Sequence, residues 1–469
     1  MKQLKAFLIP LIYLFACILF VVYKNFNGLY GQDAHEYFRY SKALLNWLQS
    51  GQNPGDYFWP VWYPMAASLI AFTTHIPTLF SLQLVSILSL VAMVFIVSIW
   101  NKESENELAK TTYSLVSVGL SPFILMSGFV SMADAMSVAF VLGALLSFKK
   151  YLSTLVSKWL YLFAFCGAFA TMTRYASAVV LLPPSLVIAF NIFSRGKWVQ
   201  ILVCLVLIFL VCLPHLVIRY QTPLSFIQHE WINTWSLTNL FERNFATRDG
   251  ITHYKIFNLA FVFLAFTHYG FGVLLIPLAC FMRSRDINST LNKTLLTSVV
   301  LYSLFLAGIP FQNKRFLLAT YPVVMLLFYP AYERLIRFVR INWLFLFVIA
   351  CVHLLIFTKI FAEYEERNLL EKKLAMLVSR QPEKTLYSFD MDVAISSYDT
   401  SKMIHNLWKQ QYDSFEINSL VLFNEEKLAK QWEGKNPMLN WQMINNSYRL
   451  HQIEMENNGW CLYKIENKK

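Results

Sequence analysis

Long apolar segments alternate with short polar stretches along most of the chain. A helix that spans a membrane needs about 20 mostly apolar residues. The segments that approach this length are 4–23, 79–100, 111–127, 135–150, 157–173, 176–193, 198–218, 256–281, 294–310, 316–331 and 342–361. The pattern therefore predicts an all-α polytopic membrane domain over residues 1–361, with about eleven transmembrane helices.

One further apolar segment, 63–76, is short and is flanked by Pro64 and Pro77. Short basic loops favour the cytoplasmic side of a membrane. If 63–76 lies along the surface, all the later basic loops fall on the same side as Lys2 and Lys5. If it spans, they fall on the opposite side, so we expect a surface helix.

This topology gives the chain a long first outer loop, 24–78, with surface helices near 33–50 and 63–76. The N-terminus is then cytoplasmic. Its apolar run is not followed by a small-residue cleavage pattern, which favours a retained first helix over a signal peptide.

The C-terminal part, 362–469, has the composition of a soluble domain and falls on the outer side. Its pattern predicts a small extracytoplasmic α/β domain. The expected elements are a helix near 362–380, a strand at 384–390, a helical stretch near 400–412, and strands at 419–423 and 460–465.

Composition supports this division. The chain is 57% hydrophobic and 14% charged, whereas soluble proteins carry about 25% charged residues. Residues 362–469 hold 14 basic and 16 acidic residues, and residues 1–361 hold 26 basic and 12 acidic ones. A basic excess on a membrane domain indicates topology and contact with anionic lipids. No basic run with interleaved aromatics indicates nucleic-acid binding.

The seven cysteines show neither a CxxC motif nor a Cys/His spacing typical of zinc. Six lie in apolar segments and Cys461 stands alone in the tail. Neither a zinc site nor a disulfide framework is expected.

The first outer loop carries the acidic stretch Asp33-Ala-His-Glu36-Tyr37. On a helix, Asp33 shares a face with Glu36 and with Tyr37. A carboxylate near lipid can act as a general base toward a hydroxyl group. The alternative is that both acids are solvated loop residues.

Two later outer turns carry charge where apolar segments meet. Asp134 opens an apolar helix, where it either caps the helix or belongs to a site. Arg174-Tyr175 lies between two apolar segments. Arg174 suits a phosphate or an ion pair, and the alternative is an arginine whose head group reaches interfacial water.

The turn before the segment 316–331 carries Lys314-Arg315. Two cations at the start of a helix are typical of an anion site, and the alternative is contact with lipid headgroups. His229-Glu230 in the loop 219–255 could touch a substrate, although one His and one Glu do not support a metal site.

Taken in order, these motifs resemble the GT-C superfamily of integral-membrane glycosyltransferases. The likeness is to the branch of protein O-mannosyltransferases and the lipid A aminoarabinose transferase (glycosyltransferase family 39-like), and it covers roughly residues 1–330. The chain departs from a strict Asp-Glu pair, because Ala34 follows Asp33. The matching stretches are Asp33-Ala-His-Glu36-Tyr37, Trp62-Tyr63-Pro64, Asp134, Arg174-Tyr175 and Arg315-Phe-Leu-Leu…Pro322.

The resemblance implies an inverting transfer from a polyprenyl-phosphate-linked sugar, either a hexose or a pentose. The acceptor would be a lipid, a glycan or a protein at the outer face of a bacterial inner or plasma membrane, in cell-envelope assembly. Asp33 would be the general base. No cofactor is expected, and a divalent metal is unsupported. The residues that would bind the donor or another substrate are Glu36, Tyr37, Asp134, Arg174, Tyr175, His229, Glu230, Lys314 and Arg315.

Two other classes of function remain open. A lipid or glycan transporter or flippase predicts ionisable residues in helix centres and a repeat between halves. Here the ionisable residues gather at one face, and no repeat is visible. A non-catalytic scaffold of polysaccharide assembly predicts no dependence on Asp33.

Overall fold

The computed structural model describes residues 2–100, 107–220, 230–339, 342–399, 401–456 and 458–469. They form two compact units. The first, the helical unit, comprises 1–28, 40–241 and 258–362, and the second, the sheet unit, comprises 29–39, 242–257 and 363–469. Two helices, α2 (Gly31–Ser50) and α16 (Asn342–Ser379), have residues in both.

The longer helices of the helical unit match the apolar pattern of the sequence. They are α1 (Lys2–Lys24), α3 (Trp62–Thr74), α4 (Thr78–Trp100), α7 (Ala133–Thr154), α8 (Ser157–Thr173), α9 (Ser177–Phe193), α10 (Trp198–Tyr220), α14 (Thr290–Ala307) and α15 (Tyr321–Phe338).

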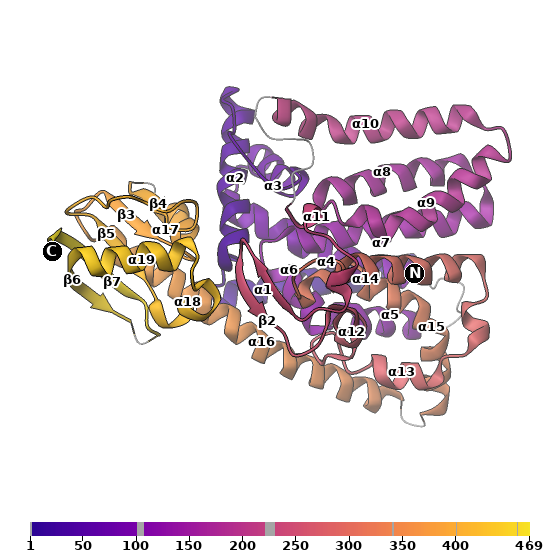
Figure 1. Cartoon of the computed structure of the whole chain (residues 1–469). Helices are drawn as coiled ribbons and strands as arrows, with labels where there is room; N and C mark the ends of the chain where they lie inside the picture. Colours follow the sequence, from indigo (N-terminus) through magenta and orange to yellow (C-terminus); the bar gives the residue numbers. More distant parts are fainter. Residues whose placement is uncertain (1, 101–106, 221–229, 340–341, 400, 457) are drawn as a thin grey trace. The chain divides into compact units, whose positions relative to one another are not determined.

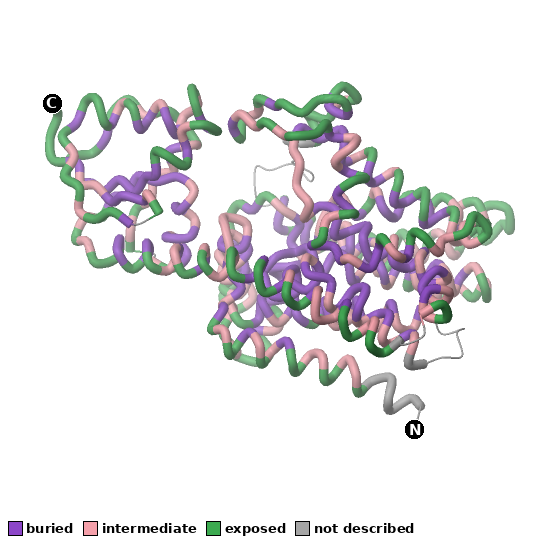
Figure 2. Tube along the Cα trace, turned by 90° about the horizontal axis from the view of Figure 1, so that it is seen from below, coloured by how far each residue is buried: buried purple, intermediate pink, exposed green. Residues whose placement is uncertain are grey.

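Helix α7 lies at the centre of this unit. It packs against α4, α8 and α9, and α8, α9 and α10 lie side by side (Figure 1). Gly143 lies on the face of α7 that meets α8, where an added Cβ would be in ordinary van der Waals contact with the sulfur of Cys166 at 3.4 Å. Buried positions run through the middle of the unit, while exposed ones lie on its outer side (Figure 2).

Among the described residues, five helices are long and apolar enough to cross a membrane: α4, α7, α10, α14 and α16. A bent pair of shorter helices raises this to six. Three more apolar helices are shorter, at Leu8–Lys24, Ser177–Phe193 and Asn258–Thr267. The protein is thus mostly helical with several membrane-compatible helices.

The predicted segment 111–127 is not one straight helix. It contains α5 (Glu107–Ser114), the π-helical turn η1 (Leu115–Gly119) and α6 (Pro122–Phe129), with a bend of 71°. Pro122 removes a backbone donor, which favours a new helix start at this point.

The predicted helix 256–281 is also wrong as a single element. The chain forms α12 (Asn258–Leu264), the 3₁₀ turn η3 (Ala265–Thr267) and, after a non-helical stretch, α13 (Leu275–Phe281). Gly272 has φ +124°, a conformation that a helix cannot contain.

Short elements connect the rest of this unit: α11 (Glu230–Asn233), η2 (Thr238–Leu240), η4 (Ser284–Ile287) and η5 (Lys314–Ala319). The surface helices expected near 33–50 and 63–76 correspond to α2 and α3.

A five-stranded sheet forms the core of the sheet unit, in the order β4-β3-β5-β7-β6. Strand β3 pairs in parallel with β4 and β5, and the pairs β5–β7 and β7–β6 are antiparallel. The strands are β3 (Thr385–Ser388), β4 (Met403–Asn406), β5 (Leu420–Phe423), β6 (Tyr448–Met455) and β7 (Cys461–Lys468). The helices are α17 (Asp392–Tyr398), α18 (Glu425–Trp432) and α19 (Asn436–Ser447).

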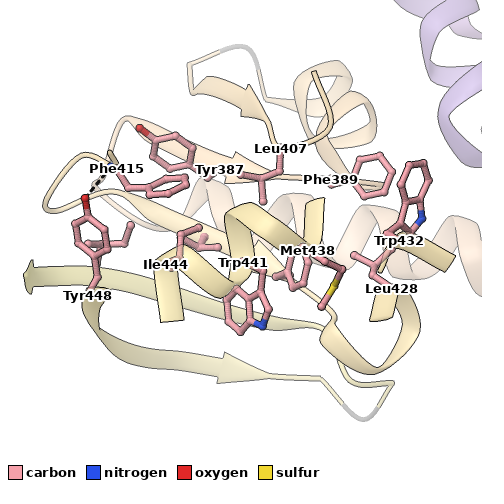
Figure 3. Packing of buried hydrophobic residues seen from close by; sticks show 13 residues of the cluster. Tyr387, Phe389, Leu407, Phe415, Leu428, Trp432, Met438, Trp441, Ile444 and Tyr448 are labelled. Carbon is pink, nitrogen blue, oxygen red and sulfur yellow. Dashed lines mark hydrogen bonds between the residues drawn. The ribbon is translucent and has the colours of Figure 1, made fainter. Parts of the chain in front are cut away.

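An aromatic cluster fills one face of this sheet (Figure 3). The ring of Phe389 meets Trp432 edge-on, with centroids 4.7 Å apart. The hydroxyl of Tyr448 accepts a hydrogen bond from the backbone N–H of Phe415 at 3.0 Å. Such a core is that of an independently packed α/β domain.

The tail contains the helix and three strands expected from sequence, but the predicted helical stretch 400–412 is wrong. It holds the edge strand β4, whose four residues pair only with β3. A hairpin of β1 (Asn244–Thr247) and β2 (Gly250–His253) adds a sixth and seventh strand to the described residues of this unit, outside the sheet.

Candidate functional site

Two arginines share one buried carboxylate at an end of the helical unit. Asp134, in the first turn of α7, forms an ion pair with Arg174. Its second oxygen lies 2.7 Å from Nε of Arg315. Asp134 is 2% exposed, while the two arginines are about a quarter exposed (21% and 24%). We call these three residues the arginine cluster.

Three separate turns build the arginine cluster. Arg174 follows α8, and its guanidinium lies 5.0 Å from the ring centroid of Phe316. The side chain of Asn313 accepts a hydrogen bond from the backbone N–H of Arg315, which fixes the start of η5. The cap of α7 is Met132 rather than Asp134, so the carboxylate of Asp134 serves the arginines.

The cluster lies at one end of the bundle. At the other end of α7, the ammonium of Lys149 donates to the backbone oxygen of Trp100 at 2.8 Å. Lys149 is fifteen residues from Asp134, about 22 Å along a helix. The three turns that the sequence predicts on the outer side, which carry Asp134, Arg174 and Arg315, thus meet at a common end.

The electrostatics of the cluster favour an anion. Two guanidinium groups and one carboxylate leave a net charge of +1. Lys314, the residue just before Arg315, is half-buried, and this burial lowers its pKa from the ordinary value of 10.5. Planar guanidinium groups held by a carboxylate match the geometry of phosphate oxygens.

Tyr175 belongs to a neighbouring polar contact rather than to the cluster. Its hydroxyl lies 2.9 Å from Nε2 of His215, which is fully buried on α10. One turn further along α10, Arg219 donates to the backbone oxygen of Phe58 at 2.8 Å. His215 and Arg219 were not identified from the sequence, because both lie in an apolar run that reads as membrane-spanning.

Asp33, Glu36 and Tyr37 lie in the sheet unit, on the first turns of α2. Asp33 is half-buried and Tyr37 is buried. Glu36 accepts two hydrogen bonds from Arg39, from Nε at 2.7 Å and from Nη2 at 2.5 Å. The structure therefore brings together Asp134, Arg174 and Arg315 in one unit, and it places the acidic stretch in the other.

His35 was missed as a candidate, although it stands inside the acidic stretch. It is fully buried between Glu371 of α16 and Ser397 of α17. Its flanking acids drew attention in the sequence, but its partners lie more than 330 residues away. No local pattern could have found them.

The remaining candidates add no site geometry. His229 lies outside the described residues, and so does the side chain of Glu230, the first residue of α11. Within the parts of the chain that the structure describes, no group of three or more His, Cys, Asp or Glu could hold a metal ion.

Solved structures with a similar fold include two of the same protein. The chain resembles the crystal structure of ArnT from Cupriavidus metallidurans bound to undecaprenyl phosphate, with a TM-score of 0.63 and 10% identity. It also resembles that of ArnT in the apo state, with a TM-score of 0.61 and 10% identity. Both matches cover 98% of this chain and 97% of the other.

No protein-family model matches the sequence, and no curated protein sequence matches it. The chain therefore has the fold of ArnT, as the expected resemblance to GT-C glycosyltransferases implies. Its apolar helices are those of a multi-pass membrane protein.

Proposed function

We propose that this chain is an inverting glycosyltransferase that moves a sugar from a polyprenyl-phosphate donor to an acceptor at the outer face of a membrane. The observation that carries the proposal is the arginine cluster. It offers a net positive site at one end of a bundle whose fold matches a structure with undecaprenyl phosphate bound.

The arginine cluster suits a departing phosphate. As the bond between the sugar carbon C1 and the phosphate oxygen breaks, negative charge grows on the phosphate. Cations that are already oriented stabilise this charge without reorganising. The ion pairs with Asp134 supply that orientation for Arg174 and Arg315.

Asp33 is the proposed general base, on the strength of its place in the acidic motif. It takes the proton of the acceptor hydroxyl, whose oxygen forms a new bond to C1 with inversion. The polyprenyl phosphate leaves from the opposite face of the sugar. Glu36 has a supporting role, since its carboxylate pairs with Arg39.

A hexose or a pentose fits the proposal, and so does a lipid, glycan or protein acceptor. The proposed place of action is a bacterial inner membrane, with the N-terminus in the cytoplasm and the sheet unit outside.

Transfer and donor binding test the proposal separately. Purified full-length protein is given undecaprenyl phosphate linked to mannose, glucose or aminoarabinose, together with envelope membranes from cells that lack the protein. We expect Asp33→Asn to slow transfer about 10²–10⁴-fold and to leave the affinity for undecaprenyl phosphate within twofold. Transfer by this variant at the wild-type rate would contradict the role of Asp33.

Arg315→Gln should weaken binding of undecaprenyl phosphate at least tenfold. The matched control is Arg334→Gln, which removes another paired arginine of the same unit, one that contacts Asp286. Equal affinities for Arg315→Gln and the wild type would overturn the phosphate site. No turnover by the wild-type protein with any of the three donors would count against the proposed donor class.

A further inference from the structure

We propose that His35 is a positioning residue that fixes the turn carrying Asp33 through contacts with Glu371 and Ser397. The inference deepens the proposed function and rests on it. It also gives the C-terminal domain a task, which is to hold the acidic turn in one conformation. The contacts involved all lie within the sheet unit.

Glu371 caps the start of α2 from another helix. Its Oε1 accepts a hydrogen bond from the backbone N–H of Gly31 at 3.1 Å, and its Oε2 lies 3.0 Å from Nε2 of His35. A carboxylate at the start of a helix satisfies an otherwise unpaired N–H and favours the helix dipole. One side chain therefore holds both the first residue of α2 and a residue one turn later.

His35 also contacts a third element, the helix α17. Its Nδ1 lies 2.6 Å from the hydroxyl oxygen of Ser397, which itself donates to the backbone oxygen of Ala394 at 2.8 Å. The imidazole is fully buried, and Ser397 is 7% exposed. Because the two ring nitrogens point to different helices, the imidazole bridges α16 and α17.

The partners of His35 are fixed in turn. Arg367 donates to Oε1 of Glu371 at 2.7 Å and contacts Asp390 at 3.2 Å. Lys427 contacts the same oxygen of Asp390 at 2.7 Å. This series of ion pairs ends at Lys427 in the first turn of α18. Residues of the domain that follows α16 therefore hold the side chain of Glu371 in place.

The segment just before α2 is held by the same helix. The side chain of Asn368 donates to the backbone oxygen of Leu29 at 2.7 Å, and the ring of Tyr30 stacks on Tyr364 with centroids 3.9 Å apart. Contacts therefore hold the chain on both sides of Asp33, at residues 29–31 before it and at His35 after it.

Holding this turn in place affects the rate of catalysis as well as the stability of the fold. Asp33 stands two residues after Gly31 and two before His35, so its backbone has little freedom once both are held. A displacement of about 1 Å in a catalytic group can cost about 100-fold in rate. A general base on an unanchored first turn would lose that much.

The test compares three variants of the full-length protein. His35→Ala removes both contacts, His35→Gln keeps an amide that reaches Glu371, and Ser397→Ala removes one hydroxyl. We expect kcat to fall about 100-fold in His35→Ala, with KM for the donor and affinity for undecaprenyl phosphate within twofold. His35→Gln should recover most of the loss, and Ser397→Ala should lose roughly tenfold.

Hydrogen exchange of the amides in 29–39 supplies a second readout. Exchange should rise in His35→Ala and stay near wild type in His35→Gln, while His451→Ala, an exposed histidine of the same unit, serves as the control. Ser397→Ala keeps the proposal testable if His35→Ala does not fold. In an Asp33→Asn background, Ser397→Ala should cause no further loss of transfer.

The outcomes separate this inference from the proposed function. If Asp33→Asn transfers sugar normally, the base assignment fails, and the positioning role of His35 fails with it. If Asp33→Asn is inactive while His35→Ala and Ser397→Ala keep wild-type kcat, only the positioning role is overturned. An equal loss in kcat and in undecaprenyl phosphate binding also overturns it, because that pattern indicates general unfolding.

Discussion

At the scale of single residues, three aspartates show how surroundings decide what a carboxylate does. Asp134 is buried between two arginines and orients them. Asp33 is half-buried on the first turn of a helix that its neighbours hold in place. Asp392 is buried at the start of α17, where one oxygen accepts a hydrogen bond from the Asn406 amide at 2.6 Å.

Asp392 leads to a pH-dependent prediction. Burial raises its pKa from 3.8 to about 6, against the hydrogen bond from Asn406, which lowers it. The ionised carboxylate therefore destabilises the folded state above the unfolded pKa, and stability falls as pH rises from about 4 to about 6. Asp392→Asn should stabilise the fold at pH 7.5 by about 3 kcal/mol.

The measurement is thermal unfolding of the full-length protein, with exchange of the amides in β3 and β4 as a local readout. The gain should vanish at pH 4, where the wild-type side chain is protonated as well. Asp399→Asn is a suitable control, since hydrogen bonds from Ser401 lower the pKa of Asp399. An equal gain at both pH values would contradict the explanation.

At the scale of elements, the β1–β2 hairpin shows how a segment between α10 and α12 packs on the C-terminal domain. The guanidinium of Arg248 lies 4.5 Å from the ring centroid of Trp408, whose indole N–H donates to the backbone oxygen of Arg248. Gln431 of α18 donates to the backbone oxygen of Asp249 at 2.9 Å. The turn of the hairpin thus contacts Trp408 and Gln431, and strand β2 also packs against α18.

Gly250 makes this docking possible. It has φ +101°, and a Cβ atom there would lie 2.5 Å from the backbone oxygen of Gln431. Gly250→Ala should therefore undock the hairpin at a cost of about 2 kcal/mol or more, seen as faster amide exchange in 244–253. Gly434→Ala is the control, because Gly434 also has positive φ but no atom within 4 Å of an added Cβ. Equal exchange in the two variants would argue against a steric role.

At the scale of the whole molecule, the distribution of charged residues over the helix ends indicates which side of the membrane each end faces. The arginine cluster occupies one end of the helical unit, and basic residues such as Lys149 and Arg334 lie toward the opposite helix ends. Basic loops favour the cytoplasm, and this supports the proposed location of the arginine cluster on the outer side of the membrane.

Cysteine labelling checks this orientation. In a background with all seven native cysteines replaced, Lys430→Cys on α18 should react with a membrane-impermeant maleimide in intact cells. Arg195→Cys, in the turn between α9 and α10, should react only after the membrane is permeabilised. Both positions are exposed. The reverse labelling pattern would overturn the proposed topology.

The apolar pattern predicted most of the helices, because length and hydropathy depend on local composition. It failed at 256–281, where Gly272 requires positive φ inside an apolar run, and at 400–412, where a four-residue edge strand is too short to show a period. The hairpin carries the Asp-Gly pair typical of tight turns, at Asp249-Gly250, and this signal could have found it.

The site was predictable only in part, for a similar reason. Charge at apolar boundaries singled out Asp134, Arg174 and Arg315, which the fold brings together. His35 could not be found in this way, since its importance lies in Glu371 and Ser397, which are distant in sequence. Buried contacts between segments that are distant in sequence cannot be recognised from the pattern of neighbouring residues.

The assembly of the sheet unit from distant segments has a consequence for how the protein is made. The acidic turn 29–39 leaves the ribosome early, but its partners Glu371 and Ser397 come only after residues 40–362. At about 5–20 residues per second, the turn waits roughly 15 to 70 s for these partners. A nascent chain inserted in the membrane would thus lack the contacts that hold residues 29–39, and with them an ordered form of the proposed base, until the C-terminal domain has been made.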